Sequence, residues 1–303
     1  MKETTEKTGY IHKSVLLHEM VDGLVIQDRD VIVDCTLNTG GHSELVLESY
    51  KDVAVIGIDA DGGAIKKAEE RLKKFGKRFI AKESNFRHLD KVLDSLKLPE
   101  VDGFMFDLGW SSDQLEISGR GFTFQKDEPL HMSYNPKETE VTAETVVNEW
   151  AEETLESIIK GFGEESFSRR IAKAIVEARA VAPIKTTTEL REIIWKSVPG
   201  FYRNKKTHPA TKTFQAIRIA VNDEFGALRD GLDKAFARVK SGRRIAVISF
   251  HCLEDRIVKQ WSKGLASEDK AILINKKPII SGKEELKFNP RARSAKLRII
   301  EKI

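Results

Sequence analysis

The sequence is poor in cysteine and contains no long apolar run. Cys35 and Cys252 are its only cysteines, too few for a structural zinc site or a disulfide framework. No stretch approaches the roughly 18 consecutive apolar residues that a membrane span requires. The first residues, MKETTEKTGYIHK, lack the apolar region of a signal peptide. These absences predict a cytoplasmic protein without a bound metal or a membrane attachment, and they leave its oligomeric state open.

The composition is that of a soluble globular protein, and its charge is unevenly spread. The 303 residues are 40% hydrophobic and 32% charged, with a formal net charge of +4, and their number suggests about two domains. Basic side chains cluster in two places: Arg203, Lys205, Lys206, His208, Lys212 and Arg218, and then Lys287, Arg291, Arg293, Lys296, Arg298 and Lys302. Such clusters suit phosphate contacts, although charge alone favours an ordinary solvated surface.

The segment from Val31 to Asp59 has the pattern of half a nucleotide-binding α/β unit. An apolar run ends at Asp34, a small-residue turn follows, then an amphipathic stretch, and a second apolar run ends at Asp59. In such units glycines let the backbone approach a ligand, and the acid after the second strand accepts hydrogen bonds from ribose hydroxyls. The pattern therefore predicts a ligand site at this turn.

The turn itself, Asn38-Thr39-Gly40-Gly41-His42, lacks the spacing G-x-G-x-x-G. This disfavours a dehydrogenase, whereas a carrier with one ribose and no pyrophosphate, such as S-adenosylmethionine, needs only the close turn and the acid. Two readings stay open from the turn alone. Gly40-Gly41 forms a ligand site with Asp59, or it is only a tight connection and Asp59 a solvated charge.

Further along the chain, strands alternate with helices. Apolar runs predict strands at 31–33, 53–58, 78–81, 101–106, 244–250, 271–275 and 296–300, and helical periodicity fills most of the intervals. The alternation predicts a parallel, doubly wound sheet. Ligands bind such sheets at the carboxyl ends of the strands. Cys35, Asp59, the turn at Phe86 and Asp107 should therefore converge on one crevice.

Between residues 115 and 206 the β signal is absent. Helical periodicity runs through 146–159, 167–180 and 188–198. This predicts an inserted all-helical domain at 115–206, flanked by an α/β domain made of residues 1–114 and 207–303. Seven strands with a closing pair at the C-terminus fit the methyltransferase version of the doubly wound sheet, in which the last strand is antiparallel.

Two strand ends carry candidate catalytic groups. Asp107 follows the fourth strand, where its carboxylate could accept a hydrogen bond from an exocyclic amino group and hold the nitrogen toward a methyl donor; the alternative is a cap on the next turn. His251 follows the fifth strand. Its position makes it an active-site candidate, although a lone histidine is more often structural. Trp110 either stacks on a base or packs.

Several longer motifs occur in the order expected of one family. They are TLNTGGHSE, GIDAD, NFRHLD, DLGWSSDQL, RGFTF, GEESFSRRIAKAIVEAR, HPATKTFQAIRIAVNDE, ISFHCLEDRIVK and NPRARSAKLR. With them the chain resembles, nearly end to end, the bacterial RsmH (MraW) family. These are S-adenosylmethionine-dependent methyltransferases of the Rossmann-like class I fold that act on the cytosine exocyclic amino nitrogen of 16S ribosomal RNA in the small ribosomal subunit.

The resemblance implies a role for particular residues. S-adenosylmethionine is the expected cofactor, a cytidine in the decoding centre the expected target, and the helical insertion the expected substrate-recognition region. Asp107 is the expected catalytic residue, with His251 second, and the RNA hypothesis assigns the RNA contacts to basic residues. The implied cofactor contacts are Gly40, Gly41, His42, Asp59, Phe86, Asp107 and Gln114, and the predicted RNA contacts are Lys205, Lys206, Arg291 and Arg293.

The sequence departs from the family pattern at two places. Cys35, Asn38 and Thr39 stand where the family has glycines, and EPLHMSYN replaces GPLDMRMD, so that an acid and a basic residue are lost at His131 and Ser133. Either change could reshape the site. Two alternatives to an RNA methyltransferase therefore stay open, namely a catalytically silent ribosome-binding assembly factor and a small-molecule methyltransferase.

Overall fold

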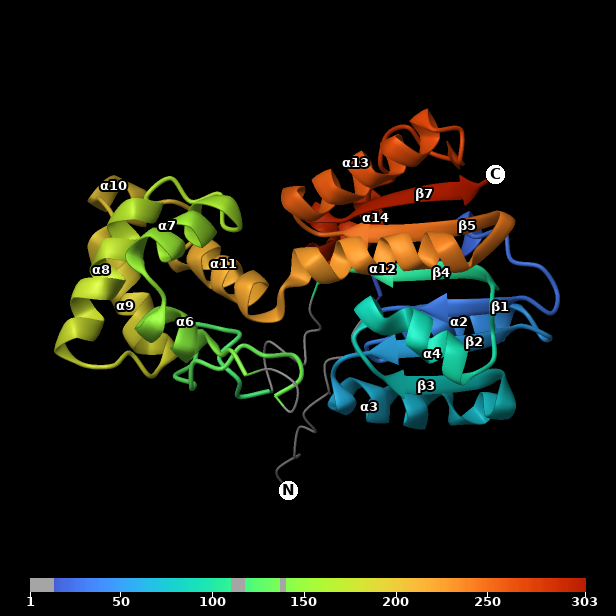
Figure 1. The fold of residues 1–303 in the computed structure, drawn as a ribbon, viewed down its shortest axis with the longest axis horizontal. Helices are drawn as coiled ribbons and strands as arrows, with labels where there is room; N and C mark the ends of the chain where they lie inside the picture. The colour runs from blue at the N-terminus through green and yellow to red at the C-terminus, as the bar shows by residue number, and fades with distance from the viewer. Residues whose placement is uncertain (1–13, 110–117, 137–139) are drawn as a thin grey trace, which may run out of the picture.

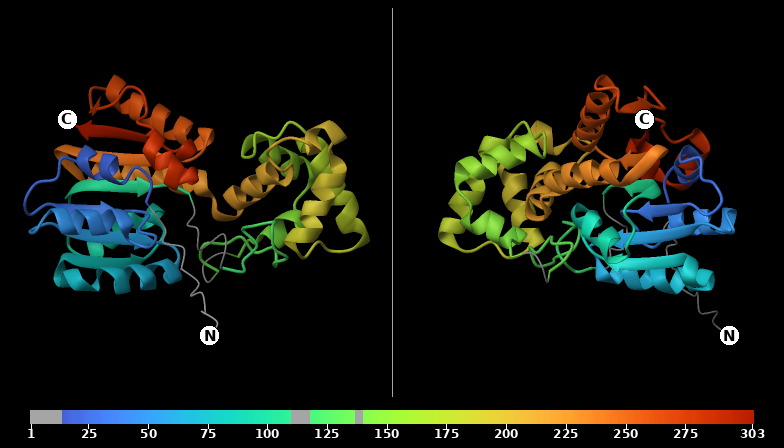
Figure 2. Two further views of the ribbon diagram at one scale, coloured as in Figure 1. Left: turned by 180° about the vertical axis from the view of Figure 1, so that it is seen from behind. Right: turned by 45° about the vertical axis from the view of Figure 1, so that its right-hand side comes forward.

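The computed structural model describes residues 14–109, 118–136 and 140–303. The described chain forms a part built on a β-sheet and a part built of helices, which lie side by side (Figure 1). The chain passes from the sheet part into the helical part after strand β4 and returns at helix α12, and Figure 2 shows the same division from two further sides.

The sheet has seven strands in the order β3-β2-β1-β4-β5-β7-β6. Strands β1 to β5 run parallel to one another, and β7 is antiparallel to both β5 and β6, as the sequence predicted. The strands are β1 (Val31–Asp34), β2 (Ala54–Asp59), β3 (Phe79–Glu83), β4 (Val101–Asp107), β5 (Val239–Ser249), β6 (Ala271–Leu273) and β7 (Lys296–Lys302).

Apolar side chains on both faces explain why the sheet is covered on both sides. Successive residues of a strand point to opposite faces. Met105 of β4 belongs to one hydrophobic core, whereas Phe104 and Phe106 belong to the core on the other face. The apolar runs of β1, β2, β4 and β5 therefore need a layer of helices on each side.

Two groups of helices supply these layers. On one face lie α1 (Leu17–Gly23), α2 (Gly41–Ser49) and α3 (Gly62–Leu72), with α14 (Lys283–Phe288) and the 3₁₀ segment η3 (Pro290–Ser294). On the other face lie α4 (Leu89–Ser95), α12 (Glu224–Arg238) and α13 (Cys252–Ser267). Two further 3₁₀ segments, η1 (Lys73–Arg78) and η2 (Phe86–His88), flank β3. This is a doubly wound fold.

The helical part has a hydrophobic core of its own. Its helices are α6 (Ala143–Glu149), α7 (Glu152–Gly161), α8 (Ser168–Val181), α9 (Thr187–Ser197), α10 (Gly200–Arg203) and α11 (Ala210–Asn222). Thr142 and Thr186 start α6 and α9 with capping boxes. No helix within the described ranges is both long and apolar enough to cross a bilayer.

Helix α11 belongs to the helical part by its packing. The sequence analysis had placed it in the α/β domain, whose second segment was predicted to start at residue 207. Its residues Ala210, Phe214, Ile217 and Val221 are instead buried in the helical core. Periodicity shows that a helix is amphipathic but not which core receives its apolar face. We propose a domain boundary after Asn222, where α12 begins.

Other predicted boundaries also differ from the structure. The helix predicted at 146–159 is two helices, α6 and α7, separated at Trp150 and Ala151, whose backbones are extended. Neither residue is proline or glycine, so no local signal marks the break. Strand β5 begins at Val239, five residues before the strand predicted at 244–250.

Candidate active site

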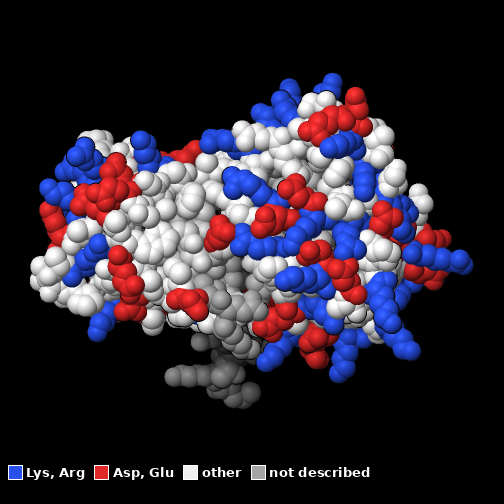
Figure 3. Space-filling model, in the orientation of Figure 1, with Lys and Arg blue, Asp and Glu red and all other residues white. Residues whose placement is uncertain are grey.

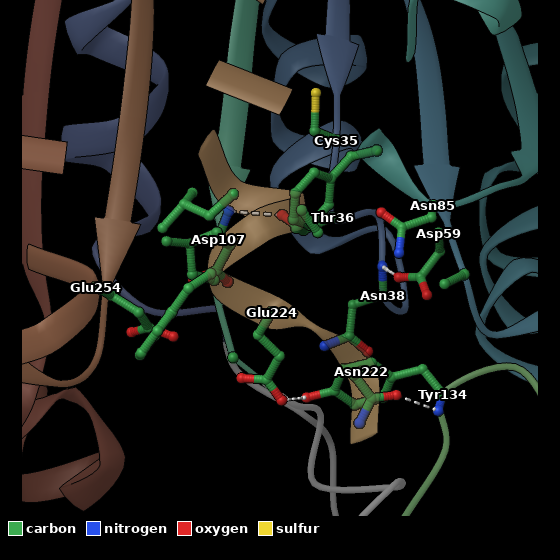
Figure 4. Close-up of a pocket in the computed structure, with 17 residues that line it drawn as sticks. Cys35, Thr36, Asn38, Asp59, Asn85, Asp107, Tyr134, Asn222, Glu224 and Glu254 are labelled. Atoms are coloured by element: carbon green, nitrogen blue, oxygen red, sulfur yellow. Dashed lines mark hydrogen bonds between the residues drawn. The ribbon is translucent and has the colours of Figure 1, made fainter. Parts of the chain in front are cut away.

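A cavity lies at the carboxyl ends of β1 to β4 (Figure 4). Its empty space is about 790 Å³, part of it open to solvent, within the range of small-molecule sites. Cys35, Asp59, Phe86 and Asp107 all line it, which confirms the convergence expected from the sheet rule. The described residues that line it are Cys35, Thr36, Asn38, Asp59, Ala60, Asn85, Phe86, Asp107, Leu108, Gly109, Tyr134, Asn222, Glu224, Phe225, Ala227, Leu228 and Glu254.

The turn after β1 is packed tightly against its neighbours. Gly40 has a left-handed backbone with φ 80°, and a Cβ there would lie 2.9 Å from Leu72 Cδ1. A Cβ at Gly41 would overlap Ser14 Oγ. Neither glycine is among the cavity-lining residues. Both positions therefore require glycine because Leu72 and Ser14 lie too close to leave room for a Cβ atom.

Asn38 is the residue of this turn that reaches the cavity. It keeps the left-handed conformation, with φ 51°, which asparagine tolerates better than most residues. Its backbone N–H donates to Asp59 Oδ2 at 2.8 Å, and its buried side-chain oxygen Oδ1 has no hydrogen-bond partner among the residues that the structure describes. Asn38 thus keeps the turn in a left-handed conformation and presents an amide at the cavity wall.

Asp59 is held at the end of β2 by two backbone donors. Its Oδ2 accepts from Asn38, and its Oδ1 accepts from the N–H of Asp61 at 2.9 Å. Burial raises the pKa of Asp59 to about 6, against the opposing effect of these two hydrogen bonds. Each carboxylate oxygen keeps a second lone pair. The side chain can therefore still accept from hydroxyl groups of a ligand.

Phe86 forms the wall after β3. Its ring lies edge-on to Phe106, with centroids 5.7 Å apart. Gly231 of α12 makes room for the ring, because a Cβ at that position would lie 2.6 Å from Phe86 Cδ2. Asn85 lies beside it and accepts from the N–H of Arg87 at 2.9 Å. This corner presents an apolar ring next to a polar amide, a combination suited to a base.

Asp107 lies at the end of β4, between the strand ends and the helical part. Its backbone N–H donates to Thr36 Oγ1 at 2.6 Å. Its Oδ2 lies 3.7 Å from His42 Nδ1, and its buried Oδ1 has no hydrogen-bond partner within the described part of the chain. Burial, followed by the charges of Asp34 and Glu254, raises the pKa of Asp107 well above its usual range. The side chain is a strong proton acceptor held at the cavity.

The junction between the helical part and α12 forms the opposite wall. Tyr134 donates its hydroxyl to Glu224 Oε1 at 2.9 Å, and its backbone N–H donates to Asn222 Oδ1 at 2.9 Å (Figure 4). Arg218, only 3% exposed, binds both oxygens of Glu224. These bonds give the wall a fixed polar surface.

His251, the second catalytic candidate predicted from the sequence, lies next to the cavity wall but is not among the lining residues. It caps helix α13, where its Nδ1 accepts from the N–H of Glu254 at 3.4 Å. Its Nε2 lies 3.1 Å from Glu254 Oε1. The position of His251 after β5 was predicted correctly, but the side chain turns back onto its own helix, and Glu254 lines the cavity in its place.

Glu224, His251 and Glu254 are of residue types that bind metal ions, and they lie close together. Within the described ranges, the histidine and acidic side chains whose ligand atoms lie within 4.8 Å of one another are Glu224, His251 and Glu254. Arg218 already pairs with Glu224 through two hydrogen bonds, and Glu254 accepts from the backbone N–H groups of Phe250 and His251. The carboxylates are thus engaged within the protein.

The other predicted residues fall in different places. Gln114 and Trp110 lie outside the described residues. His42 is 5% exposed and faces Asp107 instead of the cavity. His131 and Ser133 are not lining residues, whereas their neighbour Tyr134 is.

Sequence reasoning missed the wall opposite the strands. Asn222 and Glu224 lie at the end of the motif HPATKTFQAIRIAVNDE, and Tyr134 lies in the departing segment EPLHMSYN. Both segments were recognisable in the sequence, but no role in the site was predicted for these three residues. Hydrophobic periodicity cannot show which polar side chains of two distant segments meet.

The predicted RNA contacts lie on both parts of the molecule. Lys205 and Lys206 are exposed just after α10, where Lys205 Nζ lies 4.6 Å from the centre of the Tyr202 ring. Arg293 is exposed on η3, beside the sheet part, and Arg291 also lies in that segment. Figure 3 shows lysine and arginine interspersed with acidic residues on the face drawn.

A seven-stranded sheet with an antiparallel β7, and acids at the ends of β2 and β4 around one cavity, define a Rossmann-like methyltransferase fold. The chain belongs to the MraW methylase family, whose model matches residues 9–303.

Relatives match over nearly the whole chain. The ribosomal RNA small subunit methyltransferase H of Clostridium botulinum (strain Kyoto / Type A2) is 45% identical and covers 96% of this chain and 99% of its own. The protein of the same name from Sulfurihydrogenibium sp. is 44% identical with the same coverage. A crystal structure of an rRNA methylase from Streptococcus thermophilus covers 97% of this chain and 99% of its own at 12% identity, with a TM-score of 0.46, too distant to add to the assignment.

Proposed function

We propose that this protein transfers a methyl group from S-adenosylmethionine to the exocyclic amino nitrogen of a cytidine in the decoding centre of 16S ribosomal RNA, acting on the small ribosomal subunit in the cytoplasm. The names of the full-length relatives support the substrate class. The observation that carries the chemistry is the position of Asp107 at the cavity, between the strand ends and the second wall, with an Oδ1 that bonds to none of the described residues.

The wall made by the strand ends fits the proposed cofactor. Asp59 offers lone pairs for ribose hydroxyls, and Phe86 with Asn85 offers a ring and an amide for the adenine. Asn38 lines the same space, and its amide oxygen, which bonds to none of the described residues, suits the amino group of the methionine portion. When bound, S-adenosylmethionine supplies an electrophilic methyl group. Gly40, Gly41 and His42 support this wall from behind.

The second wall fits the acceptor base. Asp107 Oδ1 accepts a hydrogen bond from the amino N–H and thereby orients the nitrogen lone pair toward the methyl group, because in-line approach is what this transfer chiefly requires. Tyr134, Asn222 and Glu224 shape the opening on the other side, and Phe225 supplies an apolar surface. The side chains of this wall exclude water around the reacting nitrogen.

The partner is bound over a wider area than the cavity. The exposed Lys205 and Lys206 on the helical part, and Arg293 on the sheet part, suit the RNA backbone, and we include Arg291 in the same set. Lysine and arginine side chains that neutralise phosphates release counterions, so such binding weakens as salt rises. The activity of a small-molecule methyltransferase would not depend on these residues.

The test is methyl transfer from labelled S-adenosylmethionine to purified small subunits that lack the modification, with large subunits as the control. We expect label in 16S RNA at one cytidine, located by mapping the methylated nucleotide, and loss of at least about 100-fold in kcat for Asp107→Ala. Subunit binding without incorporation would refute the enzyme and support a silent assembly factor. Label that enters small molecules while the subunits stay unlabelled would refute the RNA substrate.

A further inference from the structure

His42 follows the glycine turn, yet its side chain is turned away from the cavity. The imidazole is 5% exposed, and its Nε2 lies 3.1 Å from the carbonyl oxygen of Val15. Its Nδ1 lies 3.7 Å from Asp107 Oδ2. The ring is thus held between a backbone carbonyl and the carboxyl group proposed to bind the substrate amino group.

The Val15 contact determines which imidazole nitrogen carries a hydrogen. A carbonyl oxygen only accepts, so Nε2 must donate, and Nδ1 is left as the nitrogen that gains or loses a proton. This exchangeable nitrogen is the one that faces Asp107 Oδ2. The separation of 3.7 Å is longer than a hydrogen bond, but catalytic hydrogen bonds often shorten only when the substrate is bound.

The surroundings of Asp107 favour a shared proton. Asp34 at the end of β1 and Glu254 of α13 are the acidic groups whose charges act on it, and His42 of α2 is the basic group that faces it. Together with burial, the two acids raise the pKa of Asp107. A proton that arrives on this carboxyl group is therefore well held, and His42 Nδ1 is the neighbouring atom able to bond to it.

We propose that His42 is a positioning residue for Asp107, and that the two side chains together hold the proton that the substrate amino group loses. This inference rests on the proposed function. The amino nitrogen donates its lone pair to the methyl carbon, whose bond to sulfur breaks with its electron pair left on sulfur. One N–H bond then breaks, its electrons stay on nitrogen, and the proton passes to the Asp107 carboxylate. His42 orients that carboxylate through Oδ2 and stabilises its protonated form.

Two substitutions separate the two ends of the imidazole. His42→Gln places an amide N–H where Nε2 meets Val15 but removes the nitrogen that faces Asp107. His42→Asn places a carbonyl oxygen near the Nδ1 position. We expect His42→Gln to lower kcat at least about tenfold with the KM for S-adenosylmethionine within about threefold, and to move the acid limb of the pH profile. His42→Asn should recover part of the kcat. His18→Gln, an exposed site on α1, is the matched control.

A raised KM for S-adenosylmethionine with unchanged kcat and pH profile would overturn the proposal, because it would make His42 a cofactor contact only. A second readout needs no activity. In protein labelled with ¹⁵N-histidine, the Nδ1 shift of His42 should follow a different pH titration in Asp107→Asn from that in the wild type. Coincident curves would overturn the pairing. If wild-type protein methylates no subunit, the proposed function fails while this titration still decides whether the pair exists.

Discussion

The pKa of Asp59 makes cofactor affinity a function of pH. Its carboxyl group has a pKa raised to about 6 by burial, while two backbone N–H groups hold it in place. Ribose hydroxyls donate to the ionised form, so binding should strengthen as pH rises through about 6. At about pH 5 roughly one-tenth of the groups are ionised, and at about pH 7 roughly nine-tenths. The Kd for S-adenosylmethionine should therefore fall about tenfold between them, equal to about 1.4 kcal/mol.

Asp59→Asn tests the cause of this dependence. The amide cannot ionise and offers one acceptor oxygen instead of two, so binding at about pH 7 should weaken by about 1–3 kcal/mol and lose its pH dependence. Asp34→Asn is the matched control. Asp34 also has a pKa of about 6, but it binds Ser43 Oγ at 2.7 Å and does not line the cavity, so this variant should keep the dependence.

Isothermal titration calorimetry between about pH 5 and about pH 7.5 measures the effect. The stability of the unliganded protein provides a check of opposite sign. A raised carboxyl pKa contributes stability that is fully present below the unfolded value of 3.8 and is lost as pH rises through about 6. Asp59→Asn should therefore gain stability relative to the wild type as pH rises. A wild-type Kd that is constant with pH, or an equal slope in Asp59→Asn, would refute the assignment of Asp59 to the ribose.

Two further predictions concern the turn and the basic residues. Gly41→Ala should lower the free energy of unfolding, measured by urea denaturation, by about 1–3 kcal/mol, because the new methyl group overlaps Ser14 Oγ. The control Gly264→Ala, at a helical position with open space, should not lower it. The double variant Lys205→Ala, Lys206→Ala should reduce the slope of log K against log salt for subunit binding by about one per lysine, relative to the control Lys66→Ala. Filter-binding titrations measure this slope. An unchanged slope would show that these two lysines do not contact the RNA.

The sheet was predictable because its signals are local. Runs such as Phe104 to Phe106 are apolar on both faces, and only a strand covered by helices on both sides buries such a run. The strand ends then follow from the rule that parallel strands deliver their carboxyl ends to one edge. For this reason the sequence alone predicts that Asp59 and Asp107 lie at one cavity.

The second wall was not predictable in the same way. Tyr134 and Glu224 are 90 residues apart in sequence and meet through one hydrogen bond. Their contact depends on how α11 joins the helical core, and amphipathic periodicity does not distinguish one core from another. The predicted boundary at residue 207 cut through this unit, so the residues of the second wall were divided between two predicted domains.

The orientation of the His42 side chain does not follow from its residue type and its position in the sequence. The resemblance to the family implies that His42, beside Gly41, is a cofactor contact. Its orientation is set instead by Val15, a backbone carbonyl 27 residues earlier that lies just before α1. Because that carbonyl requires the hydrogen on Nε2, the chemistry of the ring is directed at Asp107. The role of His42 thus depends on a contact between the segment before α1 and α2, which only the folded chain brings about.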